Sequence, residues 1–180
     1  ISRGLVGSEM CIRDSAIRVV IALGGSTNAV LHLLAMAKSI DVPLKIEDFE
    51  EIGKTSPLLA DLRPSGHFLM SELNAIGGIQ PLMKTLLEAN LLHGDSLTVT
   101  GKTLADNLKN VDPYPQDQKI IAPLNAPIKK DSHLKILKGN LASEGAVAKI
   151  TGKEGHNFTG PARVFNSEEE TLDAIYGSKI

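Results

Sequence analysis

The sequence predicts an α/β fold in three parts: the end of a layered α/β domain, a proline-rich linker and the start of a β-rich domain. Two observations support this prediction. Between residues 16 and 111, short apolar runs alternate with segments of helical periodicity, which is typical of α/β layers. Four prolines then fall between residues 112 and 127, and short strand-like runs separated by glycine-rich turns follow them.

Composition limits the classes of function. The chain has 180 residues, of which 42% are hydrophobic and 3% aromatic, so we expect one globular domain and part of a second. A net charge of −2 gives no basic footprint for nucleic acid, and no apolar run is long enough to span a bilayer. We therefore expect no nucleic acid partner and no membrane partner. The single cysteine excludes an internal disulfide and a metal cluster held by several cysteines of this chain.

Residues 1–15 differ from everything that follows. They show no periodicity and no signal-peptide layout. The segment resembles the translation of a sequencing-library adaptor read into a gene. We interpret it as non-native and leave it, together with Cys11, out of the fold prediction. A genuine disordered tail is the alternative.

The stretch 19–40 is the one around which the rest of the chain is organised. Its first five residues are apolar, which predicts a strand buried on both faces. Gly24 and Gly25 then predict a tight turn, and Ser26 or Thr27 suits the N-cap of an apolar helix buried in a larger domain. A strand, a glycine turn and a helix N-terminus gather free backbone N–H groups, which suits a carboxylate, a phosphate or an enolate oxygen.

This turn is the candidate substrate-binding site. Its residues are Gly24, Gly25, Ser26, Thr27 and Asn28. A purely structural strand-to-helix turn is the alternative, because the sequence lacks the glycine spacing of a dinucleotide fingerprint and the lysine of a Walker loop. On that alternative His32, Leu33 and Met36 are simply part of the core.

The other elements are predicted in order from periodicity and capping residues. Helices are expected over residues 46–52, 68–76, 81–89 and 103–109, and strands over residues 97–100, 134–137, 146–150 and 162–165. Residues 58–62 form a short apolar run that ends at a strong turn. Ser167 and Glu170 form a capping box that opens a last helix. We place the N-terminal α/β part at 16–111, the linker at 112–127 and the beginning of the C-terminal part at 128–180.

Several motifs, in the same order along the chain, resemble the dihydroxy-acid and phosphogluconate dehydratase family. They cover residues 22–33, 61–66, 76–78, 98–105, 137–142, 144–149 and 160–165. Residues 29–30 and 99–103 are more similar to the dihydroxy-acid branch. The chain is thus identified as an interior fragment of a member of this family, and the resemblance implies a swivelling β-barrel-like form for its β-rich C-terminal domain.

The resemblance implies a hydro-lyase that dehydrates 2,3-dihydroxy carboxylates to 2-keto acids in valine, isoleucine and pantothenate synthesis. It implies an iron–sulfur cluster as Lewis acid, a Mg²⁺ ion that holds the substrate, and a serine that removes a proton. It also implies a small-molecule dihydroxy-acid substrate, a homodimer, and a location in the bacterial cytoplasm or a eukaryotic organelle matrix.

The family's catalytic parts do not match residues of this chain. The cluster cysteines, the first Mg²⁺ carboxylates and a carbamylated lysine precede the position that matches Ala16. The remaining glutamate and the basic serine follow the position that matches Ile180. We therefore expect no catalytic residue, no ligand to the cluster or to Mg²⁺, and no activity of this chain alone.

The remaining histidines are interpreted without a chemical role. His93, His133 and His156 stand among turn residues with no metal-ligand spacing, so we expect them at the surface. His67 is interpreted as a solvated turn residue.

Two lysines in the matching motifs, and three glutamates that follow the last motif, also receive structural roles. Lys102 and Lys149 are interpreted as solvated or as contacts between domains. Residues 168–170 are acidic, which favours a helix N-terminus and not a metal site.

Two other functions are left open. The first is a sugar-acid dehydratase of the same family, acting on phosphogluconate or an aldonate, which a basic cluster for phosphate would favour. The second is a non-catalytic remnant or interaction module, which would have to fold alone. Against it, we expect the apolar helix that follows the glycine turn to expose surface that promotes aggregation.

Overall fold

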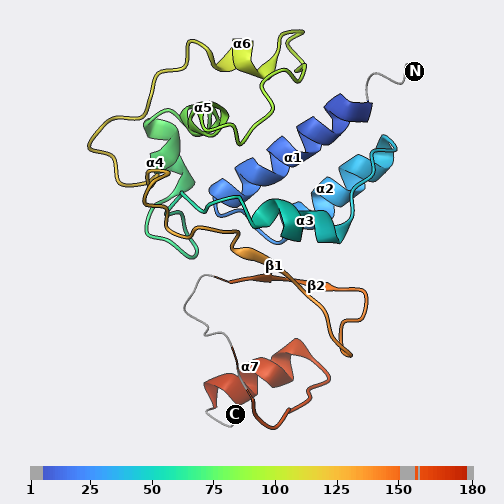
Figure 1. Cartoon of the computed structure of the whole chain (residues 1–180). Coiled ribbons are helices and arrows are strands. Elements are labelled where there is room, and N and C mark those ends of the chain that lie inside the picture. The colour runs from blue at the N-terminus through green and yellow to red at the C-terminus, as the bar shows by residue number, and fades with distance from the viewer. Residues whose placement is uncertain (1–5, 151–156, 158, 178–180) are drawn as a thin grey trace.

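The structure, a computed structural model, describes residues 6–150, 157 and 159–177 (Figure 1). It is a mixed helix-and-strand fold with one small sheet among those residues. In chain order the elements are α1 (Val6–Ala22), α2 (Asn28–Ser39), α3 (Ile46–Gly53), α4 (Met70–Ala75), α5 (Gln80–Glu88), α6 (Leu104–Leu108), β1 (Leu134–Leu137), β2 (Ala146–Lys149) and α7 (Glu168–Tyr176).

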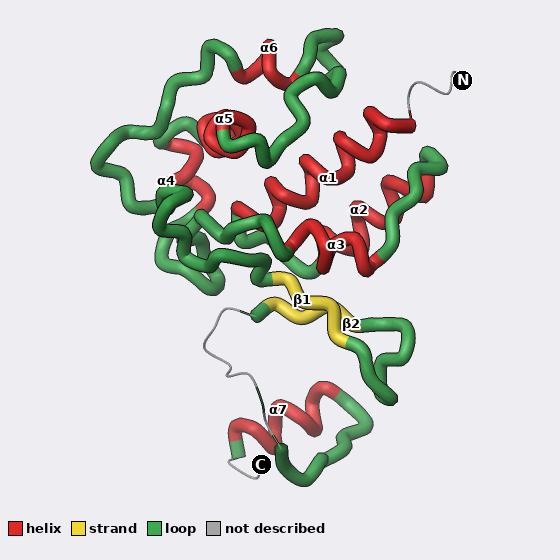
Figure 2. Tube along the Cα trace, in the orientation of Figure 1, coloured by secondary structure: helices red, strands yellow, loops and turns green. Residues whose placement is uncertain are grey.

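Helix α1 runs through the middle of the larger part of the molecule. Helices α2 and α3 pack on one side of it, whereas α4, α5 and α6 lie on the other side (Figure 1). Long irregular segments join the helices, and the β1–β2 hairpin lies below α3, with α7 beyond it (Figure 2). No helix in the described part of the chain is both long enough and apolar enough to cross a bilayer.

Two apolar cores meet at α1. The first contains Ala22 at the end of α1 and residues from the segments around α4 and α5. The second contains Ile17 and Ile21 of α1 and Phe49 of α3, and Leu134 of β1 completes it. Because Ile17 and Ile21 are four residues apart, they lie on one helical face. The C-terminal hairpin is therefore docked on the N-terminal helices through a shared core.

Strands β1 and β2 pair antiparallel, with Leu134 opposite Lys149 and Leu137 opposite Ala146. Both strands agree with the sequence prediction. Along β1, Leu134 is 2% exposed and Leu137 49% exposed. The buried end of the strand therefore faces α3, with which β1 packs.

The proline-rich segment 112–127 forms neither a helix nor a strand, as predicted. It lies against the first core, where Ile120 and Ile121 are buried. The hydroxyl of Tyr114 donates a 2.6 Å hydrogen bond to the carbonyl oxygen of Gly78, and burial raises the pKa of Tyr114 to about 12. The segment is thus packed along the helical part.

The prediction of a strand over residues 19–23 is wrong, because α1 continues to Ala22. Residues 6–15, left out of the prediction, form the first turns of this helix, and the apolar run is its last part. Whether residues 1–15 are foreign to the protein stays a prediction. Residues 1–5 of this segment lie outside the described part of the chain.

Other strand predictions also fail among the described residues. Leu97 makes an isolated bridge to Thr103, and residues 98–100 form a turn. The predicted strand 162–165 has no regular structure, and the apolar run 58–62 contributes only isolated bridges. The predicted helices, by contrast, are all present with small shifts of their ends. Apolar residues in short runs favour burial, but a strand also needs a neighbouring strand to pair with.

Helix α2 is only partly buried. Val30 and Ala37 are buried, whereas Leu31, Met36 and Ile40 are exposed. The prediction that this helix is buried is therefore not met by the described residues, which cover only one of its sides. His32 is exposed too, so it is no part of the core here.

Candidate functional site

The glycine turn is the C-terminal cap of α1. The backbone N–H of Gly24 donates to the carbonyl of Ile21 (3.0 Å), and that of Gly25 donates to the carbonyl of Val20 (2.9 Å). Gly24 has a φ of +68°. These two bonds and a left-handed glycine are the Schellman motif, which ends a helix by satisfying its last carbonyls.

Close packing leaves no room for a side chain at Gly25. A Cβ atom there would lie 2.7 Å from Cγ1 of Val20 and 3.0 Å from its carbonyl oxygen. At Gly24 it would lie 3.1 Å from Cδ1 of Leu58. Both glycines are therefore required by the local structure, whatever else the turn does.

Helix α2 begins directly after the turn. The hydroxyl of Ser26 accepts a 3.2 Å hydrogen bond from the backbone N–H of Asn28, so Ser26 fills the capping role predicted for Ser26 or Thr27. Thr27 makes no side-chain capping bond. Among the described residues the backbone N–H groups of Ser26 and Thr27 have no partner. The positive end of the helix dipole and two free donors thus lie together.

The turn forms one wall of a cavity of about 430 Å³. The lining residues are Val20, Leu23, Gly24, Gly25, Ser26, Thr27, Ala29, Leu62, Arg63, Pro64, Met70 and Lys149. Four of the five predicted site residues line it, and Asn28 does not. The cavity also contains two cationic side chains that the sequence did not point to as partners of the turn, those of Arg63 and Lys149.

Lys149 reaches the turn from β2. Its Nζ atom donates a 2.7 Å hydrogen bond to the carbonyl oxygen of Gly24, 125 residues earlier in the chain. Burial lowers the pKa of the Lys149 ammonium. Of the two roles expected for these lysines, the geometry favours a contact between domains for Lys149. Lys102 is exposed, which favours the solvated role.

His133 lies beside Lys149 on the same side of the turn. Its Nε2 atom is 2.8 Å from the carbonyl oxygen of Gly25, and the side chain is 0% exposed. The prediction of a surface position for His133 is therefore wrong. It directly precedes β1, and burial of Ser132, His133 and Leu134 together marks the point where the chain enters the core. Burial lowers the pKa of His133, although the Gly25 carbonyl raises it.

The other predicted surface histidines have different outcomes. His93 is exposed, as predicted, and His156 lies outside the described residues. His67 is 86% exposed and its Nδ1 atom pairs with Asp61 at 2.8 Å, in agreement with a solvated turn residue.

Arg63 occupies the loop opposite the glycine turn. Its Nε atom donates a 3.1 Å hydrogen bond to the carbonyl of His67, and no residue in the described part of the chain bonds its terminal guanidinium nitrogens. The sequence offered a signal for Arg63, because it stands in the motif 61–66. The position of Arg63 beside the glycine turn, however, is determined by the tertiary fold.

The described residues do not fit a metal or an iron–sulfur cluster. Among them no three His, Cys, Asp or Glu side chains come together in a way that could hold an ion. Cys11 on α1 is a free thiol without such neighbours. Any metal chemistry therefore needs ligands from outside these residues.

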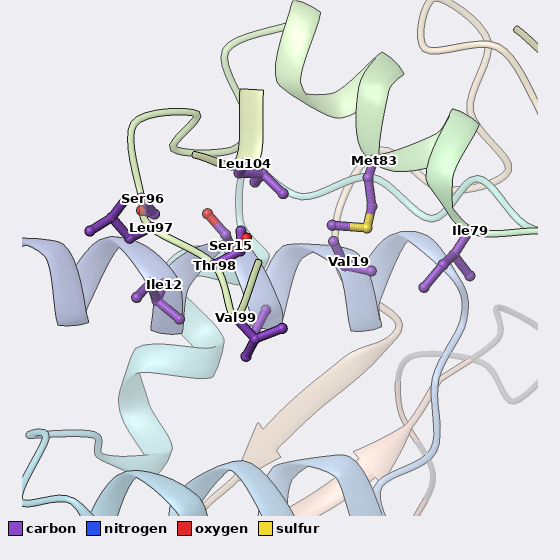
Figure 3. A pocket seen from close by; sticks show the side chains of 11 residues that line it. Ile12, Ser15, Val19, Ile79, Met83, Ser96, Leu97, Thr98, Val99 and Leu104 are labelled. Carbon is purple, nitrogen blue, oxygen red and sulfur yellow. The ribbon is translucent and has the colours of Figure 1, made fainter. Parts of the chain in front are cut away.

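A larger cavity, of about 630 Å³, lies between α1, α5 and the loop before α6 (Figure 3). Figure 3 shows Ile12 and Val19 of α1 facing Met83 and Leu104 across it. Its polar atoms come from Ser15, Ser96 and Thr98, and no charged side chain lines it. Without charge it lacks the means to fix an anionic ligand, so the smaller cavity at the glycine turn is the better candidate site.

Comparison with known proteins matches both halves of the chain to one family. Residues 9–107 match the family described as Dihydroxy-acid/6-phosphogluconate dehydratase N-terminal. Residues 119–180 match the one described as Dihydroxy-acid/6-phosphogluconate dehydratase C-terminal. The unmatched residues between them, 108–118, include the start of the proline-rich segment.

Curated relatives carry one name. A Dihydroxy-acid dehydratase of Chromohalobacter salexigens is 75% identical over 162 residues, which are 90% of this chain and 28% of that protein. Proteins of the same name from Methylococcus capsulatus and Ruthia magnifica are 66% and 64% identical over 167 residues, 93% of this chain. The chain spans 28–30% of the length of these relatives.

Proposed function

The chain belongs to the dihydroxy-acid/6-phosphogluconate dehydratase family, and on that premise we propose that it is part of a dihydroxy-acid dehydratase. Such a hydro-lyase removes water from a 2,3-dihydroxy carboxylate and yields a 2-keto acid, as in valine, isoleucine and pantothenate synthesis. The observation that carries this proposal is the 75% identity to a relative of that name over 90% of the chain. The sugar-acid alternative has no comparable support, because the relatives described above share the dihydroxy-acid name.

In the proposed enzyme, the residues that bind the iron–sulfur cluster and Mg²⁺ lie in parts of the family's polypeptide outside this chain. We further propose a small-molecule substrate, no nucleic acid partner, a homodimer in the intact enzyme and a bacterial cytoplasmic location. The C-terminal part of a layered α/β domain over 16–111, the linker over 112–127 and the beginning of a barrel-like domain over 128–180 are part of the same proposal.

Within this enzyme, residues 24–28 are proposed to bind the substrate carboxylate. Three features support this: the free N–H groups of Ser26 and Thr27, the positive end of the α2 dipole, and the cationic Arg63 and Lys149 in the same cavity. A carboxylate in this cavity would be held by charge and by directed donors together.

The first experiment is to sequence the parent gene on both sides of this chain. We expect cluster cysteines to be encoded upstream of Ala16, and a glutamate and a serine in glycine-rich motifs beyond Ile180. A gene that encodes neither set would contradict the proposal, because no cluster and no base could then be supplied.

Activity is tested in a chimeric enzyme. Residues 16–180 of this chain replace the matching segment of the Chromohalobacter salexigens dehydratase. We expect a branched 2,3-dihydroxy carboxylate to be dehydrated, and 6-phosphogluconate to be a poor substrate. A chimeric enzyme that folds and has the metal content of its parent, yet prefers 6-phosphogluconate or dehydrates neither, would overturn the assignment.

The site is tested by Arg63→Met in the chimeric enzyme. Loss of a charged donor to a carboxylate should raise KM about tenfold, since such hydrogen bonds contribute roughly 1.5–3 kcal/mol. Lys102→Met, at an exposed turn, is the matched control and should leave KM unchanged. Equal KM values for the two variants would remove Arg63 from the site.

A further inference from the structure

Two side chains from the C-terminal half hold two successive carbonyls of the glycine turn. Nζ of Lys149 donates to Gly24 and Nε2 of His133 lies within hydrogen-bonding distance of Gly25. The two contacts connect segments 125 and 108 residues apart. They therefore form only when the hairpin segment is docked on α1 and α2.

The first peptide group of the turn is held at both ends. A peptide group is planar and trans, so its C=O and N–H point in opposite directions. The carbonyl of Gly24 accepts from Lys149, and the N–H of Gly25, in the same peptide group, donates to Val20 at 2.9 Å. This group is thus fixed from both sides.

The next peptide group is held at one end only. The carbonyl of Gly25 contacts His133, whereas the N–H of Ser26, in the same peptide group, has no partner among the described residues. Fixing the carbonyl also fixes the direction of the N–H. His133 therefore orients a donor that the described residues leave free, in a residue that lines the cavity.

The protonation of His133 fits this role. A carbonyl oxygen only accepts, so Nε2 carries the proton and Nδ1 carries none in the neutral ring. Nδ1 is buried and has no hydrogen-bond partner in the described structure. A buried ring with one bonded and one unbonded nitrogen is held in one orientation by its single hydrogen bond and by packing.

Lys149 has capacity beyond this contact. Its ammonium has three donors, of which one is used by Gly24, and no carboxylate among the described residues pairs with it. Lys149 also lines the cavity. One side chain thus holds the turn and brings positive charge to the cavity wall.

We propose that His133 and Lys149 are positioning residues that hold the Gly24–Gly25 and Gly25–Ser26 peptide groups and so align the N-terminus of α2 for a carboxylate ligand. This inference rests on the proposed function of the turn. It makes the substrate-binding geometry depend on docking of the C-terminal segment, through two side chains that need not touch the substrate.

The holding contacts are tested in the chimeric enzyme, by hydrogen exchange of the backbone amides of residues 28–30, which donate to Ser26 and Thr27. In His133→Leu and Lys149→Met we expect these amides to exchange about one order of magnitude faster, because their local opening becomes easier. Lys149→Arg, which keeps a cationic donor, should restore slow exchange. Lys138→Met is the matched control, since Lys138 pairs with Glu47 away from the turn.

The functional consequence is tested in the chimeric enzyme with the same four variants. His133→Leu and Lys149→Met should raise KM for the dihydroxy carboxylate about tenfold with a smaller change in kcat, and Lys149→Arg should recover most of the loss. Lys138→Met should behave as the unaltered chimeric enzyme.

The outcomes separate the two proposals. Unchanged amide exchange in both variants overturns the positioning role, as does a lower unfolding temperature without a change in KM, which would show a purely structural role. A chimeric enzyme without substitutions that fails to dehydrate its substrate overturns the proposed function instead. In that case faster amide exchange would still show that His133 and Lys149 hold the turn.

Discussion

The Nε2 atom of His133 lies 2.8 Å from the carbonyl oxygen of Gly25, and the opposite ring nitrogen is buried without a partner. Protonation of Nδ1 would place an unsatisfied N–H and a positive charge in the protein interior, close to the cationic Lys149 and Lys129. Such a group costs free energy that neutral histidine does not. The folded chain therefore favours the neutral form.

The first prediction is a loss of stability in mild acid that comes from His133. Burial lowers its pKa in the folded chain from the ordinary 6.5, so the unfolded chain takes up the proton first. The contribution of neutral His133 to the free energy of unfolding is then complete above pH 6.5. The free energy of unfolding falls as the pH drops below 6.5, by at most about 1.4 kcal/mol per pH unit for one proton. Urea unfolding of the chain between pH 7.5 and 5.5 measures this slope.

His133→Gln is the comparison for this slope. Glutamine does not titrate, and its side-chain amide can donate to a carbonyl oxygen. We expect the variant to have a shallower dependence on pH than the unaltered chain. Identical slopes would mean that His133 does not contribute to acid sensitivity.

The second prediction concerns the two glycines of the turn. Gly24→Ala forces a side chain into the left-handed region, at a cost of about 1–2 kcal/mol. Gly25→Ala meets the backbone and side chain of Val20 and should cost at least as much. The midpoint of urea unfolding checks both values.

Gly139→Ala provides the control for the glycines. A Cβ atom at Gly139 would meet nothing within 4 Å, and the residue is exposed. We expect no loss of stability in this variant. If it lost as much as Gly24→Ala, a general effect of glycine replacement would explain the result better than the cap of α1.

The sequence allowed good prediction of elements defined by local signals. Pro81 stands in the first turn of α5, as its missing N–H requires, and the hydroxyl of Thr103 accepts from the N–H of Asp106 to cap α6. The β1–β2 hairpin also follows from alternation and a glycine turn. In these cases neighbours in the sequence supply the determining contacts.

Prediction failed where distant contacts decide. The run from 19 to 23 has strand-like composition, yet Leu59 and Ala60 cap the end of α1 by donating to the carbonyl of Ala22. His133 and Arg63 reach the site from other parts of the fold, and no spacing in the sequence reveals that they face the glycine turn. Four residues of the candidate site could be named in advance, but their cationic neighbours could not.

The third prediction concerns the apolar cavity in Figure 3. Leu97 and Val99 stand exposed at its rim, and α2 exposes further apolar side chains. Contiguous apolar surface of this kind promotes association. The double variant Leu97→Ser, Val99→Ser should therefore reduce self-association of the 180-residue chain, measured by light scattering, and should lower the binding of a hydrophobic dye.

A second double variant separates this surface from exposed apolar residues in general. Leu141 and Val164 are also exposed, but neither lines that cavity. Leu141→Ser with Val164→Ser should change scattering and dye binding less. An equal decrease in both variants would contradict a specific role of the cavity.

The last prediction concerns the core that joins the two family segments. Leu134 of β1 is 2% exposed and packs with Ile17, Ile21 and Phe49. Leu134→Ala removes buried methyl groups and leaves a cavity, which costs about 2–5 kcal/mol in comparable cores. Because β1 packs on α3, the loss should also loosen the hairpin, and amide exchange in β1 and in residues 28–30 should rise together.

Leu137→Ala is the control, because Leu137 is a leucine in the same strand whose side chain is 49% exposed. It should change the midpoint of urea unfolding and amide exchange in residues 28–30 much less. Faster exchange in β1 alone after Leu134→Ala would show that the hairpin loosens without affecting the glycine turn. Joint loosening would instead connect the buried end of β1 to the turn, since His133 is its immediate neighbour in the chain and contacts Gly25.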